Sequence, residues 1–249
     1  EPKRPEWMKV KANLGSDYRS LKNLLNDQKL NTVCEEASCP NIYECWSMGT
    51  ATFMIMGDVC TRACGFCDVK TGKPGSLDWE EPKRVAESIN TMGLSHAVIT
   101  SVNRDDLNDG GSLFFAETIR EVKKFNNGCD VEVLIPDFKG DRAAINNIIE
   151  ASPEVINHNL ETVPRLQREI RTSASYGRSL SLLHYVKSRG FEGKTKTGLI
   201  VGMGENKEEV VSVLTDISKL DVDIVTIGQY LRPTAKHRPI DRYAPEDEF

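Results

Sequence analysis

The sequence has no apolar run long enough to cross a bilayer and no excess of basic residues. A membrane-spanning helix needs about 20 mostly apolar residues, so a membrane protein is not expected. Lys and Arg number 32 against 37 Asp and Glu, which gives a formal net charge of −5. Broad nucleic-acid binding depends on a positive surface. The acidic balance therefore argues against a nucleic-acid partner.

Low-complexity segments, clear linkers and a signal-peptide pattern are also missing. The 249 residues are 39% hydrophobic and 28% charged, which is ordinary globular composition and enough for one large α/β domain. We expect a cytoplasmic protein, or a mitochondrial one in a eukaryote. The first residue is Glu1 rather than Met, so a removed leader is not excluded.

Cysteine is present in an odd number, which argues against a disulfide framework. Six of the seven cysteines lie between Cys34 and Cys67, in two groups of three. The seventh, Cys129, precedes an expected strand, where a buried cysteine acts as a small hydrophobic residue. The two groups of three need a chemical explanation.

From residue 50 onward, short apolar runs alternate with amphipathic segments. The expected strands cover 52–56, 97–99, 131–135, 154–156, 197–201 and 224–227. Asp141 and Asn206 are suited to cap two of the intervening helices, and Glu209 completes a capping box with Asn206. A shorter helix, capped by Ser16 or Asp17, is expected before the barrel. Six strands alternating with helices indicate parallel βαβ units.

This pattern predicts an α/β fold, either an incomplete (β/α)6 barrel or a doubly wound open sheet. We expect an extension over residues 1–49, which carries the first cysteine group, and a barrel over residues 50–249. In both architectures the chemistry gathers at the carboxyl ends of the strands. Polar residues follow each expected strand: Cys60, 101–105, Asp137, Asn159 with Glu161, Glu205 and Gln229.

Cys60, Cys64 and Cys67 form a C-x3-C-x2-C motif after the first expected strand. A four-iron four-sulfur cluster has four ligand sites, usually filled by cysteine. Three cysteines would leave one iron open to a substrate or cofactor, as open positions do in catalytic metal sites. The alternative is a zinc site whose fourth ligand could be His96.

With Phe66 before its last cysteine, this motif resembles the signature of radical S-adenosylmethionine (SAM) enzymes. The resemblance implies that the open iron binds the amino and carboxylate groups of SAM. One-electron cleavage then gives a 5′-deoxyadenosyl radical, which removes hydrogen from unactivated carbon.

Other positions also match this family. Gly110-Gly111 follows the second strand, and Gly202 and Glu205 belong to a G-x-I-x-G-x-x-E pattern that starts at residue 198. The resemblance implies this set of cofactor-binding residues: Phe66, Gly110, Gly111, Asn159, Glu161, Gly202 and Glu205. Taken singly, the glycines could be plain turns, and Glu205 could be a charge at a helix start.

Cys34, Cys39 and Cys45 form a second motif, C-x4-C-x5-C. It predicts a second cluster, with structural zinc or three unrelated thiols as alternatives. Five strings closely resemble lipoyl synthases: TVCEEASCPN at 32–41, CTRACGFC at 60–67, TSVNRDDL at 100–107, HNLETVP at 158–164 and GQYLRPT at 228–234.

The lipoyl synthase resemblance implies that the second four-iron four-sulfur cluster is auxiliary and is consumed as the sulfur source. All six cysteines of the two motifs would then be catalytic. Sulfur enters carbons six and eight of an octanoyl chain on a carrier lysine. The carrier is the lipoyl domain of a 2-oxoacid dehydrogenase or the glycine cleavage H protein, and a low-potential donor supplies electrons.

One departure from the family pattern concerns the auxiliary cluster. Lipoyl synthases end with an Arg-Ser-Ser-Tyr motif whose serine is the fourth ligand. The sequence runs to Phe249 without this motif. The fourth ligand is therefore unassigned.

Two surface stretches have open interpretations. Arg104, Asp105 and Asp106 form either a solvated loop or part of the active-site lining, and His237 is expected to be exposed.

Two competing functions are another radical sulfur insertion, as in biotin synthesis or RNA methylthiolation, and a two-cluster electron carrier. Cleavage of SAM would separate an enzyme from a carrier.

Overall fold

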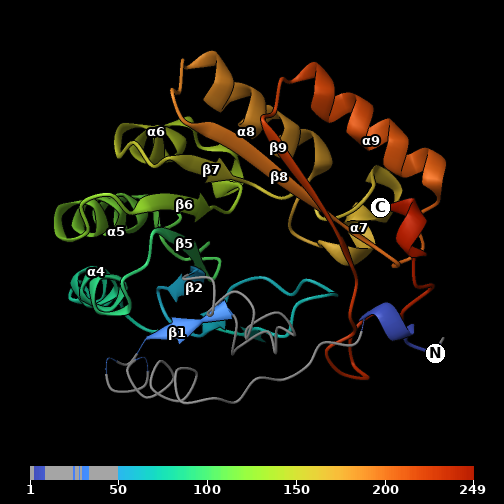
Figure 1. The fold of residues 1–249 in the computed structure, drawn as a ribbon, viewed down its shortest axis with the longest axis horizontal. Helices are drawn as coiled ribbons and strands as arrows, with labels where there is room; N and C mark the ends of the chain where they lie inside the picture. Colours follow the sequence, from blue (N-terminus) through green and yellow to red (C-terminus); the bar gives the residue numbers. More distant parts are fainter. Residues whose placement is uncertain (1–2, 9–24, 26–27, 29, 34–49) are drawn as a thin grey trace.

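The computed structural model describes residues 3–8, 25, 28, 30–33 and 50–249, and the helix expected at Ser16 or Asp17 lies outside these ranges. The main sheet has seven strands in the order β1-β2-β5-β6-β7-β8-β9 (Figure 1). They are β1 (Asn31–Thr32), β2 (Thr50–Ile55), β5 (His96–Ser101), β6 (Asp130–Leu134), β7 (Val155–Asn157), β8 (Lys194–Val201) and β9 (Ile224–Gln229). β1 is antiparallel to β2, and all other neighbouring pairs are parallel.

Helices join the parallel strands and lie along the outer face of the curved sheet (Figure 1). They are α4 (Glu81–Met92), α5 (Ser112–Phe125), α6 (Arg142–Glu150), α7 (Gln167–Ile170), α8 (Tyr176–Ser188) and α9 (Lys207–Lys219). From β2 to β9 the strands follow one another across the sheet in chain order. A doubly wound sheet reverses its strand order and carries helices on both faces. That alternative is wrong, and the partial barrel is confirmed.

The expected capping residues explain where several helices begin. The Asp141 side chain accepts a hydrogen bond from the amide of Ala143 at the start of α6. Asn206 and Glu209 form a reciprocal capping box at the start of α9. Helix α4 ends at Gly93, whose φ of 62° is easily adopted by glycine. The predicted roles of Asp141, Asn206 and Glu209 are confirmed, and the Gly93 end adds a signal that the sequence analysis did not use.

Alternate residues of the strands face opposite sides of the sheet. Phe53, Ile99 and Val133 are fully buried in the main core, between the sheet and the outer helices. Their neighbours Met54, Thr100 and Leu134 line a pocket on the inner face. Cys129 is buried in the main core, as expected.

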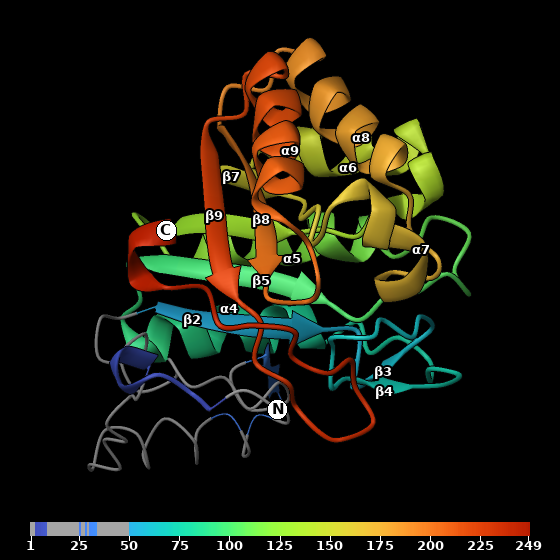
Figure 2. The same cartoon turned by 90° about the vertical axis from the view of Figure 1, so that its right-hand side faces the viewer.

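The inner face of the partial barrel leads to the carboxyl ends of the strands. A separate two-stranded sheet, β3 (Val59–Cys60) with β4 (Lys70–Thr71), lies where β2 and β5 point (Figure 2).

Short 3-10 helices cover Glu6–Met8, Phe138–Gly140, Pro164–Leu166 and Glu246–Glu248. In the described part of the chain, no helix combines the length and apolar character of a membrane span. The proposed boundary at residue 49 remains a prediction.

Candidate active site

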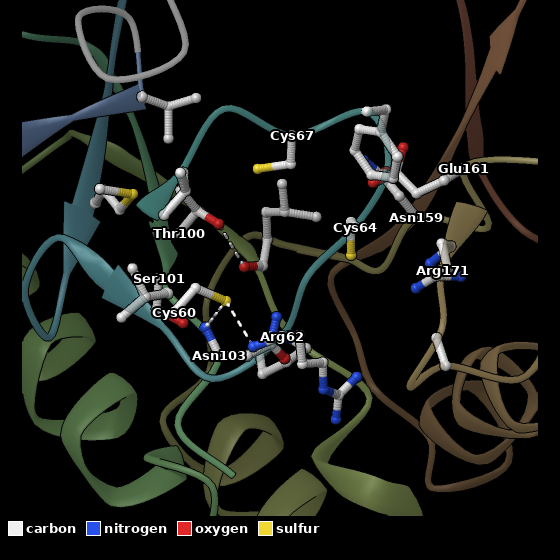
Figure 3. A pocket seen from close by; sticks show the side chains of 18 of the residues that line it. Cys60, Arg62, Cys64, Cys67, Thr100, Ser101, Asn103, Asn159, Glu161 and Arg171 are labelled. Atoms are coloured by element: carbon white, nitrogen blue, oxygen red, sulfur yellow. Dashed lines mark hydrogen bonds between the residues drawn. The ribbon is translucent and has the colours of Figure 1, made fainter. Parts of the chain in front are cut away.

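A pocket at the carboxyl ends of the strands contains the second cysteine group (Figure 3). Cys60 ends β3, while Cys64 and Cys67 lie in the loop that follows. All three line the pocket. The structure therefore brings together three thiols that the sequence motif placed within eight residues.

The loop from Cys60 to Cys67 is held by backbone hydrogen bonds from three directions. The amide of Thr61 donates to the carbonyl of Asn103 at 3.0 Å, which ties the loop to the end of β5. The amide of Gly65 donates to Ile170 at 2.8 Å, and the amide of Gly72 donates to Cys60 at 2.9 Å. The loop is thus fixed by distant elements of the barrel.

The thiols are set in a protected environment. Burial, reinforced by the neighbouring Cys67, raises the pKa of Cys64 to about 12. Burial likewise raises the pKa of Cys67. The sulfur of Cys60 accepts hydrogen bonds from the amides of Asn103 at 3.2 Å and Arg62 at 3.4 Å. Since metal ligation requires thiolates, loading this site must release protons.

A zinc site completed by His96 is not supported by the geometry. His96 begins β5, at the opposite end of the strand from the cysteines, and its Nε2 lies 3.4 Å from Glu132. Among the described residues, no three His, Cys, Asp or Glu side chains are close enough together to hold one ion. A four-iron cluster binds its cysteines at separate iron atoms. The three thiols therefore need not meet at one point to hold a cluster.

Three buried oxygen atoms of pocket residues have no hydrogen-bond partner in the part of the chain that the structure describes. They are Ser101 Oγ, Asn103 Oδ1 and Asn159 Oδ1. Most buried polar atoms in native proteins are paired. The pocket residues therefore fit a polar ligand, and the cofactor role of Asn159 remains a prediction.

Opposite charges meet beside Asn159. Glu161 lines the pocket, and burial raises its pKa although the charge of Arg171 opposes the shift. Arg171 is 8% exposed and donates from Nη1 to the Leu160 carbonyl at 3.0 Å. No motif signalled Arg171, which lies in a stretch without helical periodicity. The pair gives the pocket one acidic and one basic group.

His158 also lines the pocket, but both of its ring nitrogens are engaged. Nδ1 lies 2.9 Å from the Ile135 carbonyl and Nε2 lies 2.9 Å from Ser179 Oγ. Burial lowers the pKa of His158 to about 4, so the ring is neutral at physiological pH. A neutral ring with both nitrogens occupied supports the pocket wall and is not a free base.

Two family models match this chain. The model of the radical SAM superfamily covers residues 54–217, and the model of the N-terminal domain of lipoyl synthase covers residues 1–39. The chain is 52% identical over 248 residues to a lipoyl synthase of Flavobacterium johnsoniae, covering 100% of the chain and 86% of that relative. A mitochondrial lipoyl synthase of Nematostella vectensis is 52% identical over 249 residues, covering 100% of the chain and 85% of that relative.

The chain belongs to the lipoyl synthases. Solved structures add support for the fold alone. A methylornithine synthase superposes with a TM-score of 0.60 at 17% identity, covering 90% of this chain and 68% of that one. A maturase of the FeFe hydrogenase gives 0.62 at 14% identity, covering 89% and 56%.

Membership in the lipoyl synthases implies SAM, a four-iron four-sulfur cluster and an octanoylated carrier as substrate. Cys34, Cys39 and Cys45 lie outside the described residues, so their roles remain predictions. Phe66, Asn159 and Glu161 line the pocket with the second cysteine group. Four other expected cofactor residues do not line it: Gly110, Gly111, Gly202 and Glu205.

Gly202 and Glu205 shape a turn next to the lipoyl synthase pocket. The buried Glu205 carboxylate accepts hydrogen bonds from the amides of Gly202 at 2.6 Å and Met203 at 3.0 Å. A Cβ atom on Gly202 would lie 2.6 Å from the Arg242 carbonyl. This geometry gives both residues a structural task, and direct cofactor contact remains a prediction.

Gly110 and Gly111 form the turn before α5, with φ angles of 61° and 86°. A Cβ on Gly111 would collide with Met56, approaching its Cε to 2.8 Å, while one on Gly110 would come within 3.0 Å of the Phe138 ring. Contact with protein is enough to explain the need for glycine at both positions, and a cofactor contact remains a prediction.

Gly111→Ala is therefore expected to destabilise the fold by about 1–3 kcal/mol more than Gly57→Ala. Gly57 has a comparable φ of 96° but nothing within 4 Å of an added Cβ, so it isolates the backbone penalty from the collision. Urea unfolding of both variants measures the difference. Equal losses would show that Met56 moves aside freely.

The segment after β9 closes over the cysteine loop. The amide of Arg238 donates to the Gly65 carbonyl at 3.0 Å, and Nε2 of His237 lies 3.0 Å from the Cys67 carbonyl. The expectation that His237 is exposed is wrong, since its side chain is only 15% exposed. Leu231 and Pro233, from the same segment, line the pocket. The contact between His237 and Cys67 joins residues 170 positions apart, so sequence reasoning missed it.

Arg62 anchors the cysteine loop by charge. It makes two hydrogen bonds to Asp105, at 2.7 and 2.9 Å, and one to Asp137 at 2.7 Å. Asp137 is fully buried and also accepts from Arg178 at 2.9 Å. Arg104, Asp105 and Asp106 do not line the pocket. Asp105 acts instead by holding Arg62.

Proposed function

We propose that this lipoyl synthase inserts sulfur at carbons six and eight of an octanoyl chain on a carrier lysine. An auxiliary cluster held by Cys34, Cys39 and Cys45 is the sulfur donor. The main observation in support of the proposal is the position of Val33. Val33 lines the same pocket as the second cysteine group, and Cys34 follows it directly in the chain. The position of Val33 supports the proposal that both cysteine groups serve one reaction space.

The pocket residues suit the cofactors that the family uses. Cys60, Cys64 and Cys67 would hold the radical-generating cluster. We infer that Arg171 binds a carboxylate and that Glu161 and Asn159 accept hydrogen bonds from amino or hydroxyl groups, since all three line the pocket and Asn159 Oδ1 has no partner among the described residues. When bound, the cluster and SAM supply the chemistry that removes hydrogen from an unactivated carbon.

The rest of the pocket suits an acyl chain. Val33, Met54, Leu134, Ile200 and Leu231 give it an apolar wall. Apolar burial of this kind is worth about 0.8 kcal/mol per methylene. Phe66 and Pro233 lie at the same pocket and help to exclude water, which protects a reactive carbon from side reactions.

The competing functions have less support. A two-cluster electron carrier requires fully ligated clusters and does not need a ligand pocket, whereas this pocket carries three unpaired buried oxygen atoms of described residues.

We also propose a lipoyl domain or the glycine cleavage H protein as carrier, a separate low-potential electron donor, and a cytoplasmic or mitochondrial location.

Protein prepared without oxygen is expected to contain about eight iron and eight sulfide per chain, because each of two cysteine groups holds four of each. Iron and sulfide analysis checks this number, using protein that carries the family's Arg-Ser-Ser-Tyr segment. Stoichiometric zinc with little iron would contradict the two-cluster proposal.

A further inference from the structure

A layer of polar side chains lies inside the partial barrel. Glu132 of β6 accepts hydrogen bonds from Lys196 Nζ at 2.8 and 3.1 Å and from Asn157 Nδ2 at 3.3 Å. His96 Nε2 lies 3.4 Å from the same carboxylate. The Glu132 side chain is 6% exposed. Four strands thus contribute to one nearly buried charged group.

This layer lies directly beneath the pocket. Leu134, Asn159 and Ile200 line the pocket. Glu132 and Asn157 precede the first two by two residues, and Lys196 precedes Ile200 by four. Alternate residues of a strand share a face, and two residues span about 6.6 Å. Glu132 and Asn157 therefore belong to the next inner layer, away from the cysteines, and the long Lys196 side chain reaches Glu132 there from β8.

The intermediate position on β8 is Gly198, which contributes no side chain. A Cβ there would approach Asn159 Oδ1 to 2.8 Å. On β8, therefore, the Asn159 amide occupies the space beside Gly198, between Ile200 at the pocket and Lys196 in the polar layer. On β6, Glu132 is the next inward-facing residue below Leu134 of the apolar wall, and Lys196 is its ion-pair partner.

An alkyl chain cannot pass this layer without a large cost. It would have to displace hydrogen bonds of a nearly buried ion pair, and breaking such a pair leaves an uncompensated charge. Burial alone would raise the pKa of Glu132, but hydrogen bonds from His96 and Lys196 bring this pKa below its usual range. The Glu132 carboxylate thus stays charged, and it lies where the end of a longer acyl chain would enter.

We propose that the Glu132–Lys196 pair, held by Asn157 and His96, forms the floor of the acyl site and sets the longest acyl chain that the enzyme accepts. This inference rests on the proposed function, since it assumes an acyl substrate. One layer of about 6.6 Å matches roughly five methylene groups at about 1.3 Å each. Removing the layer should therefore admit chains two to four carbons longer.

The test compares binding of octanoyl-, decanoyl- and dodecanoyl-lysine peptides to cluster-loaded protein with SAM and without reductant, by calorimetry. The parent is expected to bind the octanoyl peptide most tightly. The Glu132→Ala/Lys196→Ala variant should shift the decanoyl-to-octanoyl affinity ratio by about tenfold toward decanoyl, because two further methylenes become buried. Lys194→Ala is the matched control: Lys194 lies one layer farther from the pocket, its side chain is 65% exposed, and it should keep the parental ratio.

A second variant, Glu132→Gln/Lys196→Met, keeps nearly the same shape and removes both charges, so it tests the floor if the alanine pair does not fold. It should shift the ratio in the same direction by a smaller factor. A parental ratio in a folded variant, with octanoyl binding intact, would overturn the floor alone, as would equal weakening for all three lengths. A parent that binds no octanoyl peptide would contradict the proposed function itself.

Discussion

Cys64→Ala is expected to abolish both deoxyadenosine formation and sulfur insertion, whereas Cys39→Ala is expected to keep the first and lose the second. Cys64 lines the pocket beside Asn159 and Glu161, where SAM is proposed to bind. Cys39 belongs to the first cysteine group, which is proposed to supply sulfur. We therefore expect its loss to leave the radical-generating site intact.

The two products are measured by chromatography and mass spectrometry after one anaerobic reaction. Cys129→Ala is the matched control, because Cys129 is a buried thiol outside both groups. Circular dichroism, together with retained iron of about four per chain, checks that Cys39→Ala still folds. Sulfur insertion at the parental rate by folded Cys39→Ala would show that the donor assignment is wrong.

Arg62→Leu is expected to lower the free energy of unfolding by about 3–5 kcal/mol, because it removes one partner from a buried ion pair. The Arg62 and Asp137 side chains are 5% and 0% exposed. The control is Arg178→Leu, which removes the second guanidinium from Asp137. Arg178 is 34% exposed, so its loss should cost about 1 kcal/mol or less. Urea unfolding of the two variants measures both values.

The same variant should change the response to acid. Burial alone would raise the pKa of Asp137, but hydrogen bonds and charge from Arg62 lower it to about 2. An unfolded aspartate titrates near about 3.9. The stabilisation from Asp137 is therefore fully present above about pH 4 and is lost as the pH falls toward 2. Arg62→Leu should lack much of this acid-range loss. A parental pH profile would show that Arg62 does not hold the carboxylate charged.

Local patterns explain why much of the fold could be predicted. The apolar runs predicted all six parallel strands. Asp141 and Asn206 cap the starts of α6 and α9, as predicted. The C-x3-C-x2-C spacing placed three thiols in one loop, and the structure places them in one pocket. Each of these signals lies within a few residues of its consequence.

Other parts of the site depend on contacts between distant segments, which a single sequence does not reveal. Arg171 belongs to no motif, and His237 reaches Cys67 only because the segment after β9 folds back. Glu132 and Lys196 lie 64 residues apart and meet through the register of three strands. Gly111 shows the reverse case. Its pattern suggested a cofactor contact, which remains a prediction, and gave no sign of the close contact with Met56.

The most direct test of the lipoyl synthase assignment is the mass of an octanoyl-lysine peptide after anaerobic incubation. The incubation contains SAM, reductant and cluster-loaded protein that carries the family's Arg-Ser-Ser-Tyr segment. We expect a product in which sulfur has replaced one hydrogen at carbon six and one at carbon eight, with no product when SAM is left out. Cleavage of SAM by a fully loaded protein that leaves the octanoyl chain unchanged would contradict the assignment.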